Sequence, residues 1–194
     1  MLALVIIAMD ARLVRYVFLD RDGVLNRKMP EGAYVCDWAQ FQWLPGAIEA
    51  VARMNRAGLT VILVSNQRGI ALGLYTHEKL NLIHANMQSQ LERHGARLDA
   101  IYYCPHDHGQ CHCRKPETGL FDQAWQRFPQ ANPQNSLVIG DSLSDIQAGH
   151  RLGMKTIFIN GEADSRKPGS AIAAKLADEV TGSLLEAVET HLRL

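Results

Sequence analysis

The sequence predicts an α/β protein whose core is a doubly wound, Rossmann-like parallel sheet with helices on both faces. Apolar strand-like runs alternate along the chain with segments of helical spacing, and such alternation gives parallel strands joined by helical crossovers. The run TVILVSN at 60–66 is continuously apolar, which is typical of a strand buried on both faces. A length of 194 residues, with 47% hydrophobic and 21% charged, suits one well-buried core. We therefore expect one domain spanning residues 1–194.

The first half of the chain supplies three of the predicted strands and two of the helices. The run YVFLD leads into two acids, and a polar loop bearing proline and glycine follows it. The next segment has apolar residues at helical spacing and ends at Gly58, a residue type that commonly terminates helices. Thr76 is a good N-cap for a longer helix with one apolar face. These elements are the strands 16–20, 60–66 and 100–104 and the helices 46–58 and 76–92.

The second half continues the alternation after a loop rich in Cys and His. SLVIGDS and KTIFIN are further apolar runs, and the helical segment between them ends at Gly153. Only the loop from Arg27 to Leu44 has room for a covering element, so we expect an essentially capless core with an open cleft. The elements predicted here are the helices 119–128 and 144–153 and the strands 136–142 and 155–160, followed by a tail with helical spacing.

Charge and the N-terminal residues limit the classes of partner. Twenty basic residues balance twenty acidic ones, so no net field would recruit nucleic acid or an anionic membrane, and we expect neither as a partner. The apolar run MLALVIIA at residues 1–8 is too short to span a bilayer and lacks the basic region of a signal peptide. We predict a cytoplasmic protein in which residues 1–15 are an N-terminal extension, and we expect a monomer.

Polar residues follow several predicted strands at the point where each strand ends. The segments are Asp20-Arg21-Asp22, Ser65-Asn66-Gln67 and Asp141-Ser142, and Arg114-Lys115 follows the Cys/His loop. Taken alone, Asp141 could cap a helix, Ser65 and Asn66 could belong to a turn, and Lys115 could be a surface lysine. Because the carboxyl ends of parallel strands meet at one edge of a sheet, their order favours a single polar site there.

This set of side chains suits phosphoryl transfer to a carboxylate. We expect Asp20 to attack phosphorus, and Asp22 to protonate the leaving alkoxide and then to deprotonate the hydrolytic water. Ser65 and Lys115 would hold the phosphoryl oxygens, a contribution of about 2–4 kcal/mol for each donor. Asp20, the backbone carbonyl of Asp22, and Asp141 would bind Mg²⁺, a hard cation that prefers oxygen ligands.

A second cluster consists of Cys104-Pro-His106 and Cys111-His-Cys113. Three thiolates and one imidazole predict a closed, tetrahedral and therefore structural Zn²⁺ site. His106 is preferred as the ligand over His108 because C-x-H mirrors C-x-C, and His108 and His112 are expected to face solvent. The zinc loop, residues 104–113, would hold Arg114 and Lys115 in place. Cys36 lies far away in sequence and is expected to be a free thiol.

The segments DRDGV, SNQ, RKP and GDSLSD, in this order, resemble the four motifs of the haloacid-dehalogenase (HAD) superfamily of phosphohydrolases. In having an acid at the second position of D-x-D, the chain resembles the phosphatases and phosphomutases of the superfamily. The dehalogenases lack that acid. The resemblance implies an aspartyl-phosphate intermediate on Asp20. A phosphomutase would need a cap that excludes water, and the sequence has no insert of that size.

The zinc loop followed by RKP, together with NQRGIALG, resembles a small, nearly capless branch of the superfamily that contains heptose bisphosphate and histidinol-phosphate phosphatases. N-Q-x-G-I-A-x-G is similar to the heptose enzymes. The resemblance implies removal of the 7-phosphate of D-glycero-D-manno-heptose 1,7-bisphosphate during synthesis of nucleotide-activated heptose for lipopolysaccharide core or surface polysaccharide. The alternatives are a histidinol-phosphate phosphatase, a polynucleotide 3′-phosphatase and a non-catalytic zinc-stabilised binding module.

The expected substrate is a small phosphorylated sugar, and the resemblance implies that Arg114 helps to recognise it. The chain departs from the heptose enzymes at Leu72, where they often have Arg, and at EGAYV (31–35), where they often have H-G-Y-V. These departures leave the predicted reaction unchanged and bear only on which sugar, and which anomer, is bound. Arg68 or Lys28 could supply a second phosphate contact in place of the missing residues. The residues expected to bind substrate are Arg21, Asn66, Gln67, Arg68, Arg114 and Ser142.

Overall fold

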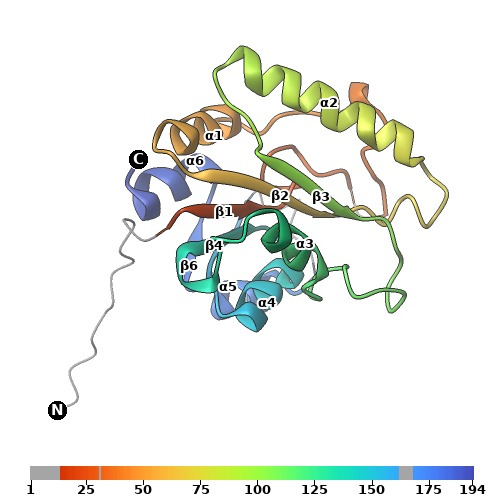
Figure 1. Cartoon of the computed structure of the whole chain (residues 1–194). Helices are drawn as coiled ribbons and strands as arrows, with labels where there is room; N and C mark the ends of the chain where they lie inside the picture. The colour runs from red at the N-terminus through yellow and green to blue at the C-terminus, as the bar shows by residue number, and fades with distance from the viewer. Residues whose placement is uncertain (1–13, 31, 162–167) are drawn as a thin grey trace.

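A sheet of parallel strands forms the centre of the molecule (Figure 1). The computed structural model describes residues 14–30, 32–161 and 168–194. Among these residues the strands follow the order β3-β2-β1-β4-β5-β6, and every neighbouring pair is parallel. The strands are β1 (Tyr16–Leu19), β2 (Thr60–Asn66), β3 (Ala100–Cys104), β4 (Ser136–Gly140), β5 (Lys155–Ile159) and β6 (Glu179–Thr181).

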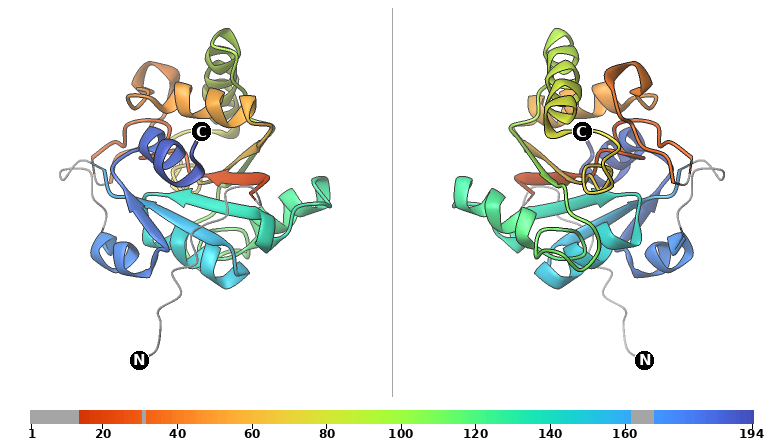
Figure 2. Two further views of the ribbon diagram at one scale, coloured as in Figure 1. Left: turned by 90° about the vertical axis from the view of Figure 1, so that its left-hand side faces the viewer. Right: turned by 90° about the vertical axis from the view of Figure 1, so that its right-hand side faces the viewer.

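Helices cover both faces of this sheet, as Figures 1 and 2 show. One face carries α1 (Ala47–Arg56), α2 (His77–Arg93) and α6 (Leu184–Ala187), which runs into a π-helical turn at Val188–Leu192. The other face carries α3 (Gly119–Arg127), α4 (Leu143–Leu152) and α5 (Ser170–Leu176). The predicted doubly wound α/β class is therefore confirmed.

The residues of β1 explain why the apolar runs lack alternation. Val17 and Leu19 pack into the core on the α1 and α2 side, whereas Tyr16 and Phe18 belong to the core on the α3 side. The Phe18 ring lies 5.1 Å from the ring of Phe121, measured between centroids. Since both faces of the strand are buried, both sets of side chains must be apolar, and each contributes about 1.5–3 kcal/mol of burial free energy.

Most element boundaries agree with the expected ones to within one or two residues, the usual uncertainty of helix and strand ends. Thr76 is the N-cap of α2, because its hydroxyl oxygen accepts a hydrogen bond from the backbone N–H of Lys79 at 3.3 Å. Gly153 ends α4 with a φ of 69°. The helical prediction for the tail was wrong in one respect, because β6 lies between α5 and α6 and pairs with β5.

The N-terminal extension falls largely outside the described residues, since the description begins at Val14. Val14 is buried, and the backbone of Arg15 bonds to Asn135 and Thr60, so these two residues already belong to the folded core. In the described ranges, no helix has both the length and the apolar character needed to cross a bilayer.

At β1 the order of the strands reverses: β2 and β3 are added on one side of it, and β4, β5 and β6 on the other. Its two neighbours, β2 and β4, lie on opposite sides of it, and chain crossovers leave it in both directions. Ligands of open α/β sheets bind at such switch points, outside the carboxyl ends of the strands. The loop at 27–44 that follows contains one short 3₁₀ helix (Trp38–Gln40) within its described part. Asp20 therefore stands at the expected binding edge.

Candidate active site

A cavity of about 680 Å³ opens at this edge of the sheet. The loop after β1 lines it with Met29, Pro30, Tyr34 and Val35, and the start of α4 lines it as well. The expected site residues that line the cavity are Asp20, Asp22, Asn66, Arg68, Arg114, Lys115 and Ser142. Four segments distant in sequence therefore meet here, as expected.

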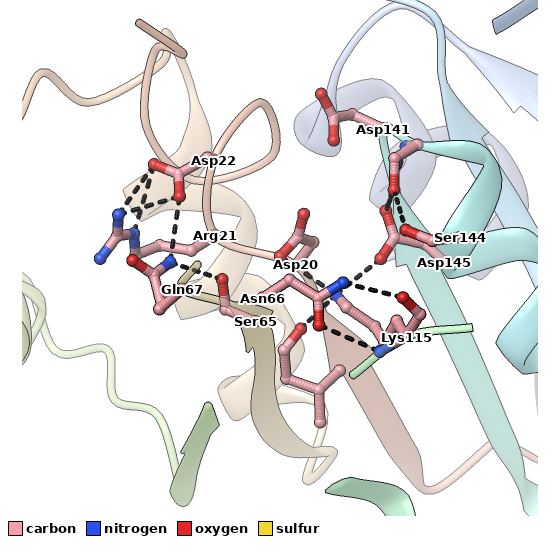
Figure 3. Close-up of polar contacts among 12 residues, drawn as sticks. Asp20, Arg21, Asp22, Ser65, Asn66, Gln67, Lys115, Asp141, Ser144 and Asp145 are labelled. Atoms are coloured by element: carbon pink, nitrogen blue, oxygen red, sulfur yellow. Dashed lines mark hydrogen bonds and ion pairs between the residues drawn. The ribbon is translucent and has the colours of Figure 1, made fainter. Parts of the chain in front are cut away.

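Lys115 lies at the centre of the polar site, and its side chain is buried (Figure 3). Its Nζ lies 3.1 Å from Oδ1 of Asp20 and 2.6 Å from Oδ1 of Asp145, and it donates to the backbone carbonyl of Val64 at 2.5 Å. Burial works to lower the pKa of Lys115, but the charges of Asp145 and Asp20 outweigh it and raise that pKa. Lys115 is therefore a charged ammonium group beside Asp20.

Asn66 fixes the backbone of Lys115. Its Nδ2 donates to the carbonyl oxygen of Lys115, and its Oδ1 accepts from the N–H of Lys115, both at 3.0 Å. This paired contact joins the end of β2 to the segment after the Cys/His loop. The lysine ammonium can then reach Asp20 because its own main chain is held at a fixed place.

Three carboxylates gather next to Lys115, namely those of Asp20, Asp141 and Asp145. Each is buried, and ligand oxygens of all three lie within 4.8 Å of one another. Lys28 forms an ion pair with Asp141. Gly23 lets these groups approach, since its φ is +94° and a Cβ atom there would lie 2.1 Å from Oδ2 of Asp141. A buried all-oxygen donor set of this charge fits Mg²⁺.

Asp145 was not among the expected site residues. Its Oδ2 accepts hydrogen bonds from the backbone N–H of Ser142 at 3.0 Å and from the Ser142 hydroxyl at 2.5 Å. Its other oxygen can face Lys115 because Gly140 has no side chain; a Cβ there would lie 2.3 Å from Cβ of Asp145. The sequence contained a signal for it, because S-x-x-D is a capping box at a helix start.

Asp22 lies on the opposite side of Asp20 from Asp141 and Asp145 in Figure 3. It accepts hydrogen bonds from Nη2 of Arg21 (2.9 Å), Nδ2 of Asn26 (2.9 Å) and Nε2 of Gln67 (3.1 Å). Burial and the charge of Asp20 act to raise the pKa of Asp22, but the charge of Arg21 and the hydrogen bonds from Asn26 and Arg21 lower it overall.

Three of the expected site residues are not among those that line the cavity, namely Arg21, Ser65 and Gln67. Arg21 is 1% exposed, and its guanidinium is directed to Asp22. Ser65 and Gln67 are each 1% exposed and are not among the residues that line the cavity, and Nε2 of Gln67 donates to Oγ of Ser65 at 2.8 Å. Arg21 was expected to touch substrate; here it is placed as the partner of Asp22 instead.

Two guanidinium groups line the cavity, those of Arg68 and Arg114. Arg68 pairs with Asp107 at 2.5 Å, and this hydrogen bond is the main reason that the pKa of Asp107 falls to about 2. Arg114 is half-buried, and its Nε and Nη1 are buried without a hydrogen-bond partner among the described residues. A guanidinium in this state is suited to an anionic ligand.

The Cys/His cluster is assembled as the spacing predicts. Cys104, His106, Cys111 and Cys113 bring their ligand atoms within 4.8 Å of one another. The sulfur atoms lie 3.1–3.5 Å apart, well beyond the S–S bond of about 2.05 Å in a disulfide. His106 is the histidine in the cluster, whereas His108 is exposed at the cavity wall. Cys36 is a free cysteine outside the cluster.

Comparison with known proteins identifies close relatives over most of the chain. The D-glycero-α-D-manno-heptose-1,7-bisphosphate 7-phosphatase of Mycobacterium bovis is 39% identical over 171 residues, 88% of this chain and 87% of that protein. The D-glycero-β-D-manno-heptose-1,7-bisphosphate 7-phosphatase of Vibrio cholerae is 36% identical over 173 residues, 84% of this chain and 91% of that protein.

Solved structures agree with the sequence relatives. The D,D-heptose 1,7-bisphosphate phosphatase of Bordetella bronchiseptica, complexed with magnesium and phosphate, superposes with a TM-score of 0.80 at 31% identity, covering 93% of this chain and 99% of that one. A HAD-hydrolase-like family model matches residues 112–187. The resemblance to the HAD superfamily is confirmed, and the chain belongs to the heptose-1,7-bisphosphate 7-phosphatase family of HAD-like hydrolases.

Proposed function

We propose that the protein removes the 7-phosphate of D-glycero-D-manno-heptose 1,7-bisphosphate through an aspartyl-phosphate intermediate. The observation that carries this proposal is the buried group of Asp20, Lys115, Asp141 and Asp145, three of which (Asp20, Lys115 and Asp145) line the cavity together with Arg68 and Arg114. The carboxylates and the ammonium group suit the reacting phosphoryl group, and the guanidinium groups suit a second phosphate.

In the first step, an oxygen of Asp20 forms a bond to phosphorus while the bond from phosphorus to the sugar oxygen breaks. The leaving alkoxide takes a proton from Asp22. In the second step, water attacks phosphorus and Asp22 takes a proton from that water, while the bond between phosphorus and the Asp20 oxygen breaks, which restores the Asp20 carboxylate and releases inorganic phosphate. Lys115 supports both steps, because its ammonium already contacts Asp20 and can donate to phosphoryl oxygens bonded there.

Asp22 needs a proton for the first step, although its pKa in the free protein is lowered. An anionic phosphate ester that enters the cavity brings negative charge close to this carboxylate. A like charge raises the pKa of a carboxyl group, so substrate binding favours the protonated form. After the alkoxide has taken the proton, Arg21, Asn26 and Gln67 stabilise the carboxylate that acts as the base.

We propose Mg²⁺ as the catalytic cofactor, held by Asp20, Asp141 and Asp145 together with the backbone carbonyl of Asp22. The three buried carboxylates support it, and Asp145 is an addition to the expected ligands. When bound, Mg²⁺ offsets the repulsion between the phosphate ester and the attacking carboxylate.

We propose Zn²⁺ for the Cys104, His106, Cys111 and Cys113 cluster, with a structural role. The cluster is tied to the active site by the backbone, because the N–H of Gln67 donates to the carbonyl of Cys104 at 2.8 Å. Free cysteines in this arrangement favour a reducing compartment, and we propose a cytoplasmic monomer whose site comes from one chain.

A turnover panel tests the substrate. It contains both anomers of D-glycero-D-manno-heptose 1,7-bisphosphate, fructose 1,6-bisphosphate, histidinol phosphate and a 3′-phosphorylated oligonucleotide. We expect the largest kcat/KM for a heptose bisphosphate, and relatives named for each anomer are the reason to test both. A preference for histidinol phosphate or for the oligonucleotide would overturn the substrate while leaving the chemistry in place.

The variant Asp20→Asn tests the chemistry separately. It removes the nucleophile, so phosphate release should fall by at least about 1000-fold on every substrate. Asp122→Asn, an exposed change on α3, is the matched control and should behave like the wild type. Phosphate release by Asp20→Asn at the wild-type rate would exclude the aspartyl-phosphate mechanism.

A further inference from the structure

Tyr75 belongs to a buried chain of hydrogen bonds that ends at two of the proposed catalytic residues. Its hydroxyl donates to Oε1 of Gln67 at 2.7 Å. Nε2 of the same amide donates to Oγ of Ser65 at 2.8 Å and to Oδ2 of Asp22 at 3.1 Å. Tyr75 is 4% exposed, and the other two links, Ser65 and Gln67, are 1% exposed. The contacts that join Tyr75, Gln67 and Ser65 are therefore shielded from water, which strengthens them, whereas the Asp22 side chain is 24% exposed.

The partners of Gln67 determine which way its amide faces. Asp22 is a carboxylate and can only accept, so it attracts the NH₂ group. The Tyr75 hydroxyl selects the same orientation, because its buried hydrogen is accepted by Oε1 of Gln67. A reversed amide would turn its NH₂ group towards that hydrogen and leave it unpaired, which is costly in a buried position.

The orientation of the amide decides what the Ser65 hydroxyl can do. A hydroxyl has one hydrogen to donate and two lone pairs that accept. Because Gln67 donates to Oγ of Ser65, a lone pair is used and the hydroxyl hydrogen is left for another acceptor. A reversed amide would present its oxygen to Ser65 and would take up that hydrogen. Ser65 would then be unable to donate it to a phosphoryl oxygen.

The local sequence builds a place for the Tyr75 ring. Gly69 lies against it, and a Cβ atom on Gly69 would lie 2.2 Å from Cε1 of the ring. The backbone N–H of Leu74 donates to the carbonyl of Gly69 at 2.9 Å, which closes the loop that carries the tyrosine. Burial raises the pKa of Tyr75, so the hydroxyl keeps its hydrogen at neutral pH.

We propose that Tyr75 is a positioning residue, whose hydroxyl fixes the Gln67 amide so that the Ser65 hydroxyl donates to the substrate phosphoryl group. This inference rests on the role as a phosphoryl ligand that the sequence predicts for Ser65, which directly precedes the cavity-lining Asn66 on β2. Tyr75 itself acts only through Gln67. While Asp22 is ionised, it also holds the Gln67 amide in this orientation by accepting from its NH₂ group. During the step in which Asp22 carries a proton, Tyr75 maintains the orientation.

A double-mutant cycle tests the proposal with p-nitrophenyl phosphate as the substrate, so that the identity of the natural substrate does not matter. Tyr75→Phe should lower kcat/KM by about 10-fold, since it leaves the Gln67 oxygen buried without a donor. In a Ser65→Ala protein, the same change should have an effect of less than about 2-fold, because the hydroxyl that it orients is absent. Thermal unfolding of all four proteins separates loss of stability from loss of positioning.

The control is Tyr103→Phe, which also removes one tyrosine hydroxyl and one hydrogen bond, here to Nδ1 of His77, outside the chain of contacts. Its kcat/KM should match the wild type. Equal losses from Tyr75→Phe in the wild-type and Ser65→Ala backgrounds would overturn the positioning role. If Ser65→Ala alone had no effect, the proposed phosphoryl contact of Ser65 would fail, and the inference with it.

The isosteric change Gln67→Glu gives an independent test. A carboxylate at this position can only accept, so it should capture the Ser65 hydrogen and repel Asp22. We expect kcat/KM to fall by at least about 100-fold, and more than in Gln67→Met, which has a similar shape but no hydrogen-bonding amide. A Gln67→Glu protein that is folded and as active as Gln67→Met would contradict the donor requirement at Ser65.

Discussion

The ammonium group of Lys28 forms an ion pair with the carboxylate of Asp141, and the two side chains are only 11% and 4% exposed. Lys28 also lines the cavity that contains Asp20. A cation that binds Asp141 must therefore compete with a tethered ammonium group, because like charges repel strongly where water is largely excluded. Lys28 can approach Asp141 because residue 23 is a glycine, since a Cβ atom there would lie 2.9 Å from Cε of Lys28.

The variant Lys28→Met should bind Mg²⁺ more tightly than the wild type. Removal of the competing charge should lower the half-saturating Mg²⁺ concentration by about 10-fold, measured by calorimetric titration of the metal-free protein and by activity. Lys79→Met, which removes an exposed lysine of α2, should leave this concentration unchanged. A higher half-saturating concentration in Lys28→Met would show that Lys28 assists the metal rather than competing with it.

The positions of the main site residues could be predicted because they follow from the topology. Asp20, Ser65 and Asp141 each end or follow a parallel strand, and parallel strands end at one edge. The Cys/His cluster was predictable from its short spacing in the sequence, and its four ligand atoms do lie within 4.8 Å of one another. Burial of both sheet faces likewise follows from unbroken apolar runs.

Side-chain directions within the site could not be predicted in the same way. Asp22 is directed to Gln67, 45 residues further along the chain, and Lys115 reaches Val64 on β2 and Asp145 on α4. Such choices depend on the sum of long-range hydrogen bonds and charges, which no local pattern encodes. Strand β6 was missed because its three residues lie between helical segments and carry little signal of their own.

The proposed zinc site should contribute to stability. We expect about one zinc per chain in the purified protein, and Cys111→Ser should lose it together with more than about 3 kcal/mol of unfolding free energy. Metal content by mass spectrometry and urea unfolding measure the two effects. Cys36→Ser is the control, because Cys36 lies outside the cluster. A metal-free Cys111→Ser protein with wild-type stability would remove the structural role of zinc.

Gly23 should be required for the carboxylate cluster as well as for the backbone turn. Gly23→Ala combines strain at a φ of +94° with a Cβ atom 2.1 Å from Oδ2 of Asp141, so Asp141 must move. Gly58→Ala has a comparable φ of +79° with no atom within 4 Å of the added carbon. Both variants should lose about 1 kcal/mol of unfolding free energy from the backbone strain. Only Gly23→Ala should also lose at least about 10-fold in Mg²⁺ affinity and activity; equal Mg²⁺ affinities in the two variants would contradict this.

His84 should make the fold sensitive to acid. It is 6% exposed on α2, and burial, together with the charge of Arg21, lowers its pKa from 6.5 to about 3. Between these two values the unfolded chain binds a proton at this residue and the folded chain does not. Stability therefore falls as pH drops from 6.5 towards 3, by about 1.4 kcal/mol per pH unit from this one group, and is unaffected by it above pH 6.5.

The variant His84→Leu removes this titration and should flatten the fall in stability across that pH range. Urea unfolding at several pH values between about 6.5 and about 4 measures the slope for the variant and the wild type. His150→Leu replaces an exposed histidine of α4 and serves as the control, which should keep the wild-type slope. An unchanged slope in His84→Leu would mean that the pKa of His84 is the same in the folded and the unfolded protein. Near neutral pH the same variant should be at least as stable as the wild type, since Nε2 of His84 is buried without a hydrogen-bond partner among the described residues, and its replacement removes that cost.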